Sequence, residues 1–454
     1  MVEIKFPLRA HHLPADDGSC GWFERLPDRG RRGRRLEGSR EADCVVVGAG
    51  FTGLAIARRL RLVRPEWTVI LLDAQRVGTG TSGRCSGFVC DLVDFTAKMN
   101  VEDCARHVRV ARSGIEELRK LVTDHRIACD WDEKGWIRAA SGPAGEKLLG
   151  RWPGWAQRWG IPFRHLGRQD LQAVTGSRFY SKGIRFIGAP LVQGAALVRG
   201  LASALPEGVE LFEDSAVSSI EDNGRYHLRT GAGTVAAERV FLATNAYTPA
   251  LNTLQRKVFP LYTFGSLTRP LSAGEQELLG GESEWGILAT DDMGSTVRRT
   301  RDQRILIRNT VHYTKKPNVS NSLLRKVRRE HRRAFEARFP ALGSVGFDHT
   351  WSGLMASSMG YRPVFGELAE SFFVAAVYTA AGIAMGTAMG RLLADQAAGV
   401  DSDLLRDMSA IPGPRSMPPE PFRSLGARWT MARIKIQSAA STSNVAVGHS
   451  SSGR

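Results

Sequence analysis

A glycine-rich turn between an apolar strand and a helix constrains the fold of this chain more than any other segment. Residues 45–53 read Val-Val-Val-Gly-Ala-Gly-Phe-Thr-Gly, and the next apolar run ends at Asp73, twenty positions after the third glycine. Gly48 permits the tight turn out of the strand, Gly50 lets the backbone approach a pyrophosphate, and Gly53 lets the following helix pack closely. Because Asp73 at this spacing suits a ribose hydroxyl, the segment predicts a dinucleotide-binding βαβ unit.

The sequence around this turn supplies the context that the motif requires. Residues 54–62 predict a helix directly after the glycines, and residues 69–72 predict a second strand that ends at the acidic residue. A helix that starts at the turn offers free amides and the positive end of its dipole to a phosphate. The alternative is a glycine-rich turn in an unrelated α/β protein, which would not need this surrounding pattern. The turn alone identifies neither the dinucleotide nor the reaction.

Length and charge set the next limits. The 454 residues exceed one ordinary domain, so we expect two domains. The 62 Lys and Arg residues outnumber the 46 Asp and Glu residues, which gives a net charge of +16, and the excess is concentrated in residues 29–40 and 325–338. The second cluster carries apolar residues at near-helical spacing and is followed by Pro340, so it predicts an amphipathic helix with a solvated arginine face. A nucleic-acid-binding surface is the alternative, but the chain has no recognised nucleic-acid module.

Cysteine spacing and the apolar segments exclude several other classes. The six cysteines form no C-x-x-C pair and no Cys/His spacing, so we expect no disulfide framework and no metal site. The first twenty residues hold Asp16 and Asp17 and no continuous apolar run, so we expect no secretory signal and a cytoplasmic protein. Residues 372–390 are uncharged, but their composition changes midway. They predict a buried strand at 372–378 and a small-residue helix at 382–393, not a membrane span.

Five motifs follow one another along the chain. They are the glycine-rich turn with Asp73, Thr81-Ser-Gly-Arg-Cys-Ser-Gly-Phe88, Ala243-Thr-Asn-Ala-Tyr247, Trp351-Ser-Gly353 with Pro363 and Gly366, and residues 382–390. In this order they resemble the D-amino-acid oxidase superfamily of flavoenzymes, which includes glycine oxidase, sarcosine oxidase and the γ-glutamylputrescine oxidoreductase group. Residues 82–88 and the Cys20-Gly21-Trp22 segment are most similar to the last of these. The resemblance covers about residues 20–425 and implies FAD bound in extended form.

The resemblance also implies the domain organisation. We expect an α/β fold with a Rossmann-like FAD-binding domain that is discontinuous in sequence, and an α+β substrate domain whose mixed sheet covers the isoalloxazine ring. The expected segments are a basic N-terminal arm with few core residues at 1–40, an FAD-binding domain at 41–95, 187–255 and 346–400, a substrate domain at 96–186 and 256–345, and a C-terminal extension at 401–454 that is disordered over 438–453.

Roles for individual residues follow from the same resemblance. The glycine-rich turn and Asp73 would hold the ADP half, Arg84 and neighbouring amides would lie between pyrophosphate and flavin ring, and the 382–385 turn would stabilise negative charge on the reduced flavin. The implied cofactor-binding residues are Gly48, Ala49, Gly50, Phe51, Thr52, Gly53, Asp73, Ala74, Thr81, Ser82, Gly83, Arg84, Cys85, Ser86, Gly87, Phe88, Ser215, Ala216, Val217, Ala243, Thr244, Asn245, Tyr247, Gly353, Gly382, Ile383, Ala384 and Met385.

The chain departs from the superfamily pattern where cofactor and substrate would meet. Relatives usually carry Asn at the position of Cys85, and a different turn at residues 378–382. Sarcosine oxidases attach flavin through a cysteine near Gly353 and place a lysine near Leu306, and this chain has neither residue. We therefore expect noncovalent FAD. A covalent bond through Cys85 is the alternative, but a cysteine near a flavin is more often inert.

Substrate contacts are expected from strands of the second domain, because these strands would face the flavin ring. Tyr262 and Arg308 are the candidate substrate-contacting, catalytic residues. The alternative is that Tyr262 is a buried tyrosine with a satisfied hydroxyl and Arg308 a structural arginine.

These observations predict an FAD-dependent oxidoreductase that oxidises a C–N bond of a small amine or amino acid. Hydride would pass from the α-carbon to flavin N5, and the imine product would then hydrolyse, with oxygen or another electron acceptor reoxidising the flavin. Three alternatives remain: a nicotinamide-dependent dehydrogenase, an RNA-modifying flavoenzyme that acts on an aminomethyl base of tRNA, and a nonredox flavin-binding protein. The basic composition favours the second, and the altered turn at 379–381 favours the third.

Overall fold

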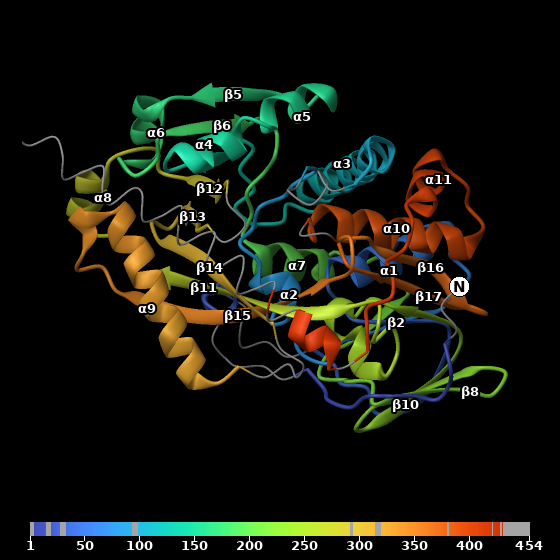
Figure 1. Ribbon diagram of the computed structural model, residues 1–454. Coiled ribbons are helices and arrows are strands. Elements are labelled where there is room, and N and C mark those ends of the chain that lie inside the picture. The colour runs from blue at the N-terminus through green and yellow to red at the C-terminus, as the bar shows by residue number, and fades with distance from the viewer. Residues whose placement is uncertain are drawn as a thin grey trace, which may run out of the picture.

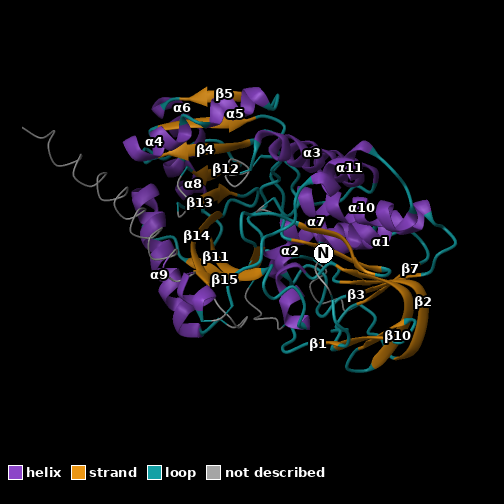
Figure 2. Cartoon of the chain, turned by 45° about the vertical axis from the view of Figure 1, so that its right-hand side comes forward, coloured by secondary structure: helices purple, strands orange, loops and turns teal. Residues whose placement is uncertain are grey.

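The computed structural model describes residues 4–14, 20–27, 33–92, 99–290, 294–313, 319–378, 381–419, 421–426 and 429. Two layered bodies lie side by side, each built around one sheet (Figures 1 and 2). Thr379 and Ala380 of the altered turn, and the C-terminal segment 438–453, fall outside the described residues. Among the described residues, no helix has both the length and the apolar character needed to cross a membrane.

The first sheet has nine strands and contains the predicted βαβ unit. Its main path runs β1-β8-β9-β10-β2-β3-β7, while β17 pairs with β10 and β16 pairs with β17. The pairs β17–β10, β10–β2, β2–β3 and β3–β7 are all parallel, which suits the continuous apolar runs of these strands. The strands are β1 (Leu8–Arg9), β2 (Gly38–Val47), β3 (Val69–Leu72), β7 (Val209–Phe212), β8 (Ser219–Asp222), β9 (Tyr226–Arg229), β10 (Gly233–Leu242), β16 (Val364–Ala369) and β17 (Phe372–Ala376).

The glycine-rich turn joins β2 to helix α1 (Phe51–Val63), so the predicted helix at 54–62 is confirmed and begins three residues earlier. Gly48 adopts a φ of +102°, a conformation that residues with a Cβ rarely adopt. A Cβ placed on Gly53 would overlap the carbonyl oxygen of Gly48. The helix can therefore start directly against the end of the strand only because both positions are glycine.

A layer of helices covers one face of this sheet (Figure 1). Helix α10 (Ala384–Ala398) packs on α1 and on α3 (Val101–Asp124), while α7 (Gly194–Ser203) and α11 (Asp403–Ala410) complete the layer. The predicted small-residue helix at 382–393 is thus confirmed, and its glycines explain the close approach. A Cβ on Gly390 would overlap the Thr52 carbonyl oxygen of α1.

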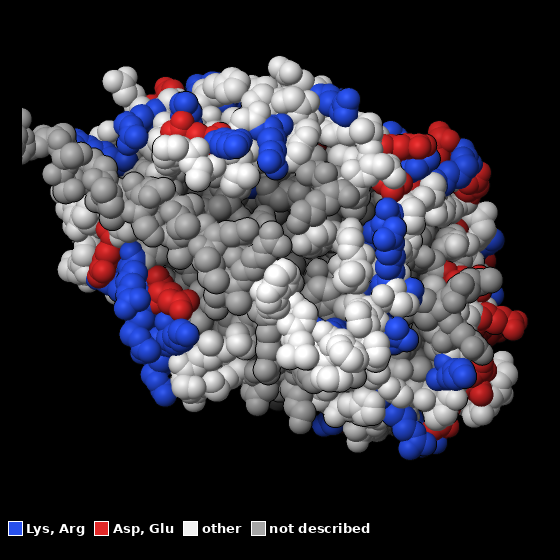
Figure 3. All heavy atoms as spheres, viewed as in Figure 1, with Lys and Arg blue, Asp and Glu red and all other residues white. Residues whose placement is uncertain are grey.

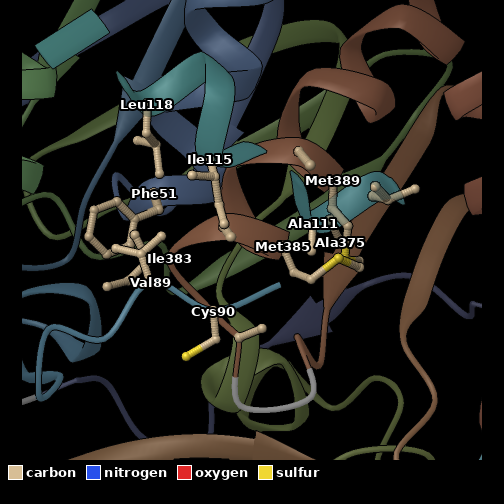
Figure 4. Close-up of a cluster of buried hydrophobic side chains, with 14 of the residues drawn as sticks. Phe51, Val89, Cys90, Ala111, Ile115, Leu118, Ala375, Ile383, Met385 and Met389 are labelled. Atoms are coloured by element: carbon tan, nitrogen blue, oxygen red, sulfur yellow. The ribbon is translucent and has the colours of Figure 1, made fainter. Parts of the chain in front are cut away.

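The core beneath this layer joins segments that are distant in sequence. Figure 4 shows Phe51 beside Ile383, with side chains of α3 and α10 packed around them. All of them belong to one buried cluster. Because α1, α3 and α10 meet in a single core, the N-termini of α1 and α10 are held close together.

The second sheet has eight strands in the order β15-β11-β14-β13-β12-β4-β6-β5, running from β5 at the top of Figure 1 down to β15. The pairs are antiparallel except β12–β4, so the sheet is mixed, as predicted. The strands are β4 (Trp136–Ala140), β5 (Phe163–Leu166), β6 (Lys182–Phe186), β11 (Phe259–Thr268), β12 (Trp285–Ala289), β13 (Thr296–Arg299), β14 (Ile305–Tyr313) and β15 (Phe347–Ser357). The remaining helices are α2 (Thr81–Arg84), α4 (Pro143–Leu149), α5 (Trp152–Arg158), α6 (Arg168–Thr175), α8 (Ala273–Leu279), α9 (Asn321–Arg338) and the 3-10 turns η1 (Phe23–Arg25), η3 (Asn245–Leu251) and η4 (Pro340–Leu342).

Strand pairing divides the chain differently from the expected domain segments in two places. Strand β15 falls within the expected cofactor segment 346–400, yet it pairs with β11 over its whole length and belongs to the second sheet. Helix α3 falls within the expected substrate segment 96–186, yet it packs on α10 and α7 over the first sheet. The physical reason is that β15 completes its hydrogen-bond ladder on β11, and α3 buries its apolar face against α10, α11 and α7.

The predicted basic helix is α9, and its arginine face is solvated as expected. Val327, His331 and Phe335 are buried, and so is Arg338, which donates to the hydroxyl of Tyr180. The exposed Lys and Arg residues of α9 gather at the lower left edge in Figure 3. The helix ends at Arg338, two residues before the proline expected to stop it.

The N-terminal arm contributes more to the core than the sequence predicted. Strand β1 pairs with β8, and Trp22 and Phe23 are buried against Trp351 in a cluster that also includes side chains of α7 and the second sheet. The expectation of few core residues was wrong, because the arm's apolar side chains are separated by polar residues and show no helical or strand period. The buried arm residues are Leu8, Cys20, Trp22, Phe23, Leu26 and Leu36.

The contact between α1 and α10 predicts opposite effects for two helical Gly→Ala substitutions. Gly390→Ala should lower the free energy of unfolding by about 1–3 kcal/mol, because the new methyl group must displace the backbone of α1. Gly154→Ala, at an exposed position of α5, should raise the free energy of unfolding by about 0.5–1 kcal/mol, because nothing lies near the added carbon. Urea unfolding of both variants measures this difference, and equal effects would show that the α1–α10 contact is not tight.

Candidate cofactor and substrate site

A cavity of about 420 Å³ is lined by residues of both sheets. One wall comes from the glycine-rich turn, the end of β3, the α2 segment and the turn before α10. The opposite wall comes from six neighbouring strands of the second sheet, β15, β11, β14, β13, β12 and β4. The first sheet therefore presents its strand ends and helix starts to the cavity, and the second sheet presents a face.

Asp73 lies at the end of β3 and contacts the glycine-rich turn directly. One carboxylate oxygen accepts from the Ala49 amide at 2.7 Å, and the other accepts from the Gln75 amide at 2.9 Å. Burial, with a smaller contribution from nearby Glu213 and Asp214, raises the pKa of Asp73 to about 6. The carboxylate is thus ionised at neutral pH and protonated in mild acid.

The first turn of α1 is open to the cavity. Its N-cap residue is Gly50, which provides no capping side chain, and Gly50, Phe51 and Thr52 all line the cavity. Ser82 lies directly against this turn, since its hydroxyl accepts from the Phe51 amide at 3.3 Å and a Cβ on Gly50 would come within 2.6 Å of it. A helix N-terminus with this opening is a typical anion-binding site.

Most of the cofactor-binding residues inferred from the sequence line this cavity. They are Gly48, Ala49, Gly50, Phe51, Thr52, Asp73, Ala74, Thr81, Ser82, Cys85, Ser86, Gly87, Phe88, Ser215, Ala216, Val217, Ala243, Thr244, Asn245, Tyr247, Gly353, Gly382 and Ile383. The stretch from Ser215 to Val217 lies before β8, which starts at Ser219. The irregular backbone before β8 is what brings Val217 to the cavity.

Five inferred residues do not line the cavity and support its walls instead. Gly53, Gly83, Ala384 and Met385 are buried in the packing behind it. Arg84 was expected between pyrophosphate and flavin ring, but its guanidinium donates to the carbonyl oxygens of Thr79 and Ser352. Arg84 thus links α2 to β15 by a hydrogen bond. The cavity is lined instead by the nearby residues Thr81, Ser82 and Cys85.

Cys85 lines the cavity as a neutral thiol. Burial raises the pKa of the Cys85 thiol to about 11, and a Cβ on Gly194 would lie only 2.6 Å from its sulfur. The thiolate is the nucleophilic form of cysteine, so this environment disfavours bond formation with a cofactor. All six cysteines lie among the described residues, and none of them forms a disulfide bond.

Arg308 is a cation on the opposite wall. It projects from β14, and its guanidinium donates to the hydroxyl of Thr296 on the neighbouring strand at 3.1 Å. Burial lowers the pKa of Arg308, and no carboxylate within the described ranges forms an ion pair with it. A partly buried guanidinium with free donor capacity is suited to an anionic group of a ligand.

Tyr262, the other candidate for substrate contact, is not brought to the cavity. Its side chain is 6 % exposed in a buried apolar cluster, and its ring is tilted relative to the ring of Phe264, with ring centres 6.2 Å apart. The adjacent Thr263 lines the cavity instead. Since side chains alternate along a strand, the register of β11 decides which of the two faces the site, and the sequence does not reveal that register.

Arg138 is a lining residue that the sequence analysis missed. It is 2 % exposed, donates to the carbonyl oxygen of Ala289 at 2.9 Å, and its guanidinium lies 3.9 Å from the ring centre of Trp152. The available signal was a single arginine within the otherwise apolar strand Trp136–Ala140. A buried arginine in such a strand requires partners, and here they are an aromatic ring and a backbone carbonyl.

Leu306, at the position where sarcosine oxidases place a lysine, is fully buried and does not line the cavity.

Other lining residues that the sequence did not predict carried no local signal, because only the tertiary structure brings them to the site. The missed lining residues include Ala10, His12, Leu13 and Pro14 of the arm, Gln75, Arg76, Ala250, Leu251, Thr263, Leu288, Ala289, Gly294, Thr296, Met355, Ala356 and Tyr378.

Comparison with known proteins identifies the group that this cavity holds. A family model described as FAD dependent oxidoreductase (DAO) matches residues 43–396. The chain belongs to the DAO family of FAD-dependent oxidoreductases. The cofactor is FAD, which excludes the nicotinamide alternative. The cavity fits this group, since the glycine turn, the open start of α1 and the Asp73 carboxylate face one space.

Two relatives of known sequence span most of the chain. A probable oxidoreductase OrdL of Rhizobium meliloti (strain 1021) is 27% identical over 409 residues, which cover 83% of this chain and 89% of the relative. The gamma-glutamylputrescine oxidoreductase of Escherichia coli (strain K12) is 26% identical over 429 residues, which cover 88% of this chain and 95% of the relative. These similarities agree with the family that the sequence motifs implied.

The fold of this DAO-family chain is shared with solved structures. Glycine oxidase from Geobacillus kaustophilus superimposes with a TM-score of 0.67 at 22% identity, covering 80% of this chain and 96% of that protein. Iminodiacetate oxidase from Chelativorans sp. BNC1 superimposes with a TM-score of 0.62 at 18% identity, covering 82% of this chain and 100% of that protein. The Rossmann-like cofactor domain and mixed-sheet second domain predicted from the sequence are confirmed.

The raised pKa of Asp73 predicts a pH-dependent affinity for FAD. The ionised carboxylate is the stronger hydrogen-bond acceptor, so binding favours the deprotonated form and the affinity should rise as pH increases through about 6. Asp73→Asn should match the wild type near pH ~5, bind about 10-fold more weakly near pH ~8, and show no pH dependence between them.

Fluorescence titration of the apoprotein with FAD at both pH values measures this. The control is Asp124→Asn, which removes an exposed carboxylate at the end of α3 that pairs with Lys120. A pH dependence that persists in Asp73→Asn would assign the titration to another group.

Proposed function

We propose that this chain oxidises a C–N bond of a small amine that also bears a carboxylate, that is, an amino acid or N-substituted amino acid. The observation that carries this proposal is Arg308, a guanidinium in the cavity wall with no ion-pair partner among the described residues. FAD supplies the oxidant, since flavin N5 can take the hydride from the α-carbon and leave an imine for hydrolysis. The names of the relatives, among them glycine oxidase and gamma-glutamylputrescine oxidoreductase, support an amine or amino-acid substrate.

The residues of the second sheet would bind and orient this substrate. Arg308 would receive the carboxylate, and its bond to Thr296 holds the guanidinium in a fixed direction on the sheet. Thr263 adds a hydroxyl to the same wall, while Leu288 and Met355 give it apolar surface that excludes water. Fixing the carboxylate at one point of a rigid sheet orients the α-carbon, and orientation accounts for much of the rate.

Among the residues of this wall that the structure describes, no carboxylate is placed to take a proton from the substrate amine. Among the described lining residues, the only carboxylate is that of Asp73 and the only imidazole is that of His12. Both lie on the side of the cavity formed by the first sheet and the arm. The described part of the second-sheet wall therefore supplies binding and orientation rather than general-base catalysis.

Of the alternatives, the RNA-modifying enzyme has one feature in its favour, the exposed basic face of α9. That face lies on the outer side of the second sheet, whereas Arg308 lies in the cavity wall. The nonredox alternative rested on the altered turn at 379–381, of which only Ala381 is described. Arg308 favours a small anionic substrate over both.

The deciding experiment is anaerobic reduction of the bound flavin by a panel of amines and amino acids. We expect loss of flavin absorbance with one or more carboxylate-bearing amines, and slower or no loss with polyamines that lack a carboxylate. Admitting air or adding an artificial acceptor to the reduced protein then distinguishes oxygen from another electron acceptor. If no amine or amino acid bleaches the flavin, the proposal fails.

Replacement of Arg308 should raise KM for substrates that carry a carboxylate and leave KM unchanged for substrates that lack one. Arg308→Met should raise KM for the best amino acid by about 10- to 100-fold, because a charge-assisted hydrogen bond to a buried partner contributes about 1.5–3 kcal/mol. KM for a matched amine without the carboxylate should stay the same. Arg308→Lys should restore part of the affinity, because it keeps the charge but not the fork of donors.

Steady-state kinetics on the two substrates measure this difference. Arg329→Met, on the exposed face of α9, is the matched control and should leave both values unchanged. An equal loss for both substrates would assign Arg308 a structural role.

A further inference from the structure

The cofactor cavity is lined in part by residues that precede the family match. The match begins at residue 43, yet Ala10, His12, Leu13 and Pro14 of the N-terminal arm line the cavity. We propose that residues 10–14 form the outer wall of the adenosine part of the FAD site, so that this chain retains its cofactor by means of its own arm.

Main-chain hydrogen bonds fix the path of the arm on its N-terminal side. Strand β1 pairs with β8, with Leu8 opposite Ile220, and the ladder continues through the Ala10 amide, which donates to the Ser218 carbonyl at 2.8 Å. The next amide, of His11, donates to the Ala250 carbonyl at 2.9 Å. The arm thus leaves the edge of the first sheet and crosses to η3.

The arm is hydrogen-bonded to two segments, the one before β8 and the end of η3. We assign both to the part of the cavity that would hold the ADP half of FAD. The segment 215–217, which precedes β8, lines the cavity, and the Ser215 amide donates to the Asp73 carbonyl at 2.8 Å. On the other side, Ala250 and Leu251 at the end of η3 also line the cavity. The arm is hydrogen-bonded to both sides at Ala10 and His11, and residues 12–14 follow directly after these bonds and line the same cavity.

The arm is anchored a second time after this crossing. The indole of Trp22 donates to the Cys85 carbonyl at 2.8 Å, and the buried side chain of Gln193 donates to the Trp22 carbonyl at 3.0 Å. The Trp22 ring also lies edge-on to Trp351 of β15, with ring centres 6.3 Å apart. Residues 12–14 are therefore held between two anchors and are not part of a frayed end.

The chemistry of the arm suits an adenine ring. Leu13 is an apolar side chain that is 47 % exposed while it lines a cavity, and Pro14 beside it is rigid. Ala216, Val217 and Leu251 add small apolar surface to the same space. A flat, mostly apolar ring between such surfaces is the usual arrangement of a nucleotide base site.

One consequence is that FAD and FMN should respond differently to changes in the arm. FMN carries the flavin ring and one phosphate but no adenosine, so it does not reach residues 10–14. Weakening the arm should therefore lower the affinity for FAD and leave the affinity for FMN unchanged. A general loss of folding would lower both.

The test compares flavin binding by the full-length double variant Leu13→Ser/Pro14→Ser with the wild type. We expect FAD to bind at least about 10-fold more weakly to the variant apoprotein, the dissociation of FAD from the holoprotein to be correspondingly faster, and FMN affinity to be unchanged. Flavin fluorescence reports all three quantities. Leu278→Ser, which alters a leucine 61 % exposed on α8, is the matched control and should leave FAD binding unchanged.

Two results would overturn the proposal. Unchanged FAD affinity in the double variant would show that the arm does not hold the adenosine. Equal losses for FAD and FMN would show that the arm only supports the fold, which the thermal stability of the apoprotein would report independently. Because no substrate is used, the outcome does not depend on whether the chain oxidises amino acids.

Discussion

The contact of backbone on backbone at the glycine-rich turn is the constraint on which the rest of this structure depends. The start of α1 lies against the end of β2 because Gly53 leaves no Cβ between the helix and the Gly48 carbonyl. Helix α10 packs closely against α1 because its Gly390 has no Cβ, and α10 also packs on α3. Small residues therefore set the distances between these elements, and larger side chains would push the helix starts away from the cavity.

The two walls of the cavity offer different binding groups, because the first sheet meets the cavity with its strand ends and the second sheet with a face. The first sheet presents helix N-termini and strand ends, which offer backbone amides and the Asp73 carboxylate to a cofactor. The second sheet presents a face, which offers the side chains Arg308, Thr296 and Thr263. Under the proposed function, a cofactor that uses many backbone donors and a small substrate that uses one directed cation would be bound by different kinds of secondary structure.

The arm adds a third component that neither sheet supplies. Its residues are held by main-chain hydrogen bonds to β8 and η3 and by the buried indole of Trp22. These anchors join the cofactor sheet to the second sheet, since Trp22 contacts α2 through Cys85 and β15 through Trp351. The N-terminal segment is therefore part of the closed cavity and of the core.

The sequence by itself determined the cofactor, the family and the elements with strong local signals. The glycine turn with Asp73, the strand at 69–72 and the helices α1, α9 and α10 were all predictable from the sequence, because each has a local period or a conformation that few residues allow. Only the tertiary structure decided the rest. It showed that Thr263 rather than Tyr262 faces the cavity, that Arg84 ties α2 to β15, and that the arm lines the site. Strand register, side-chain direction and the docking of an irregular segment depend on partners distant in sequence, and no local pattern encodes them.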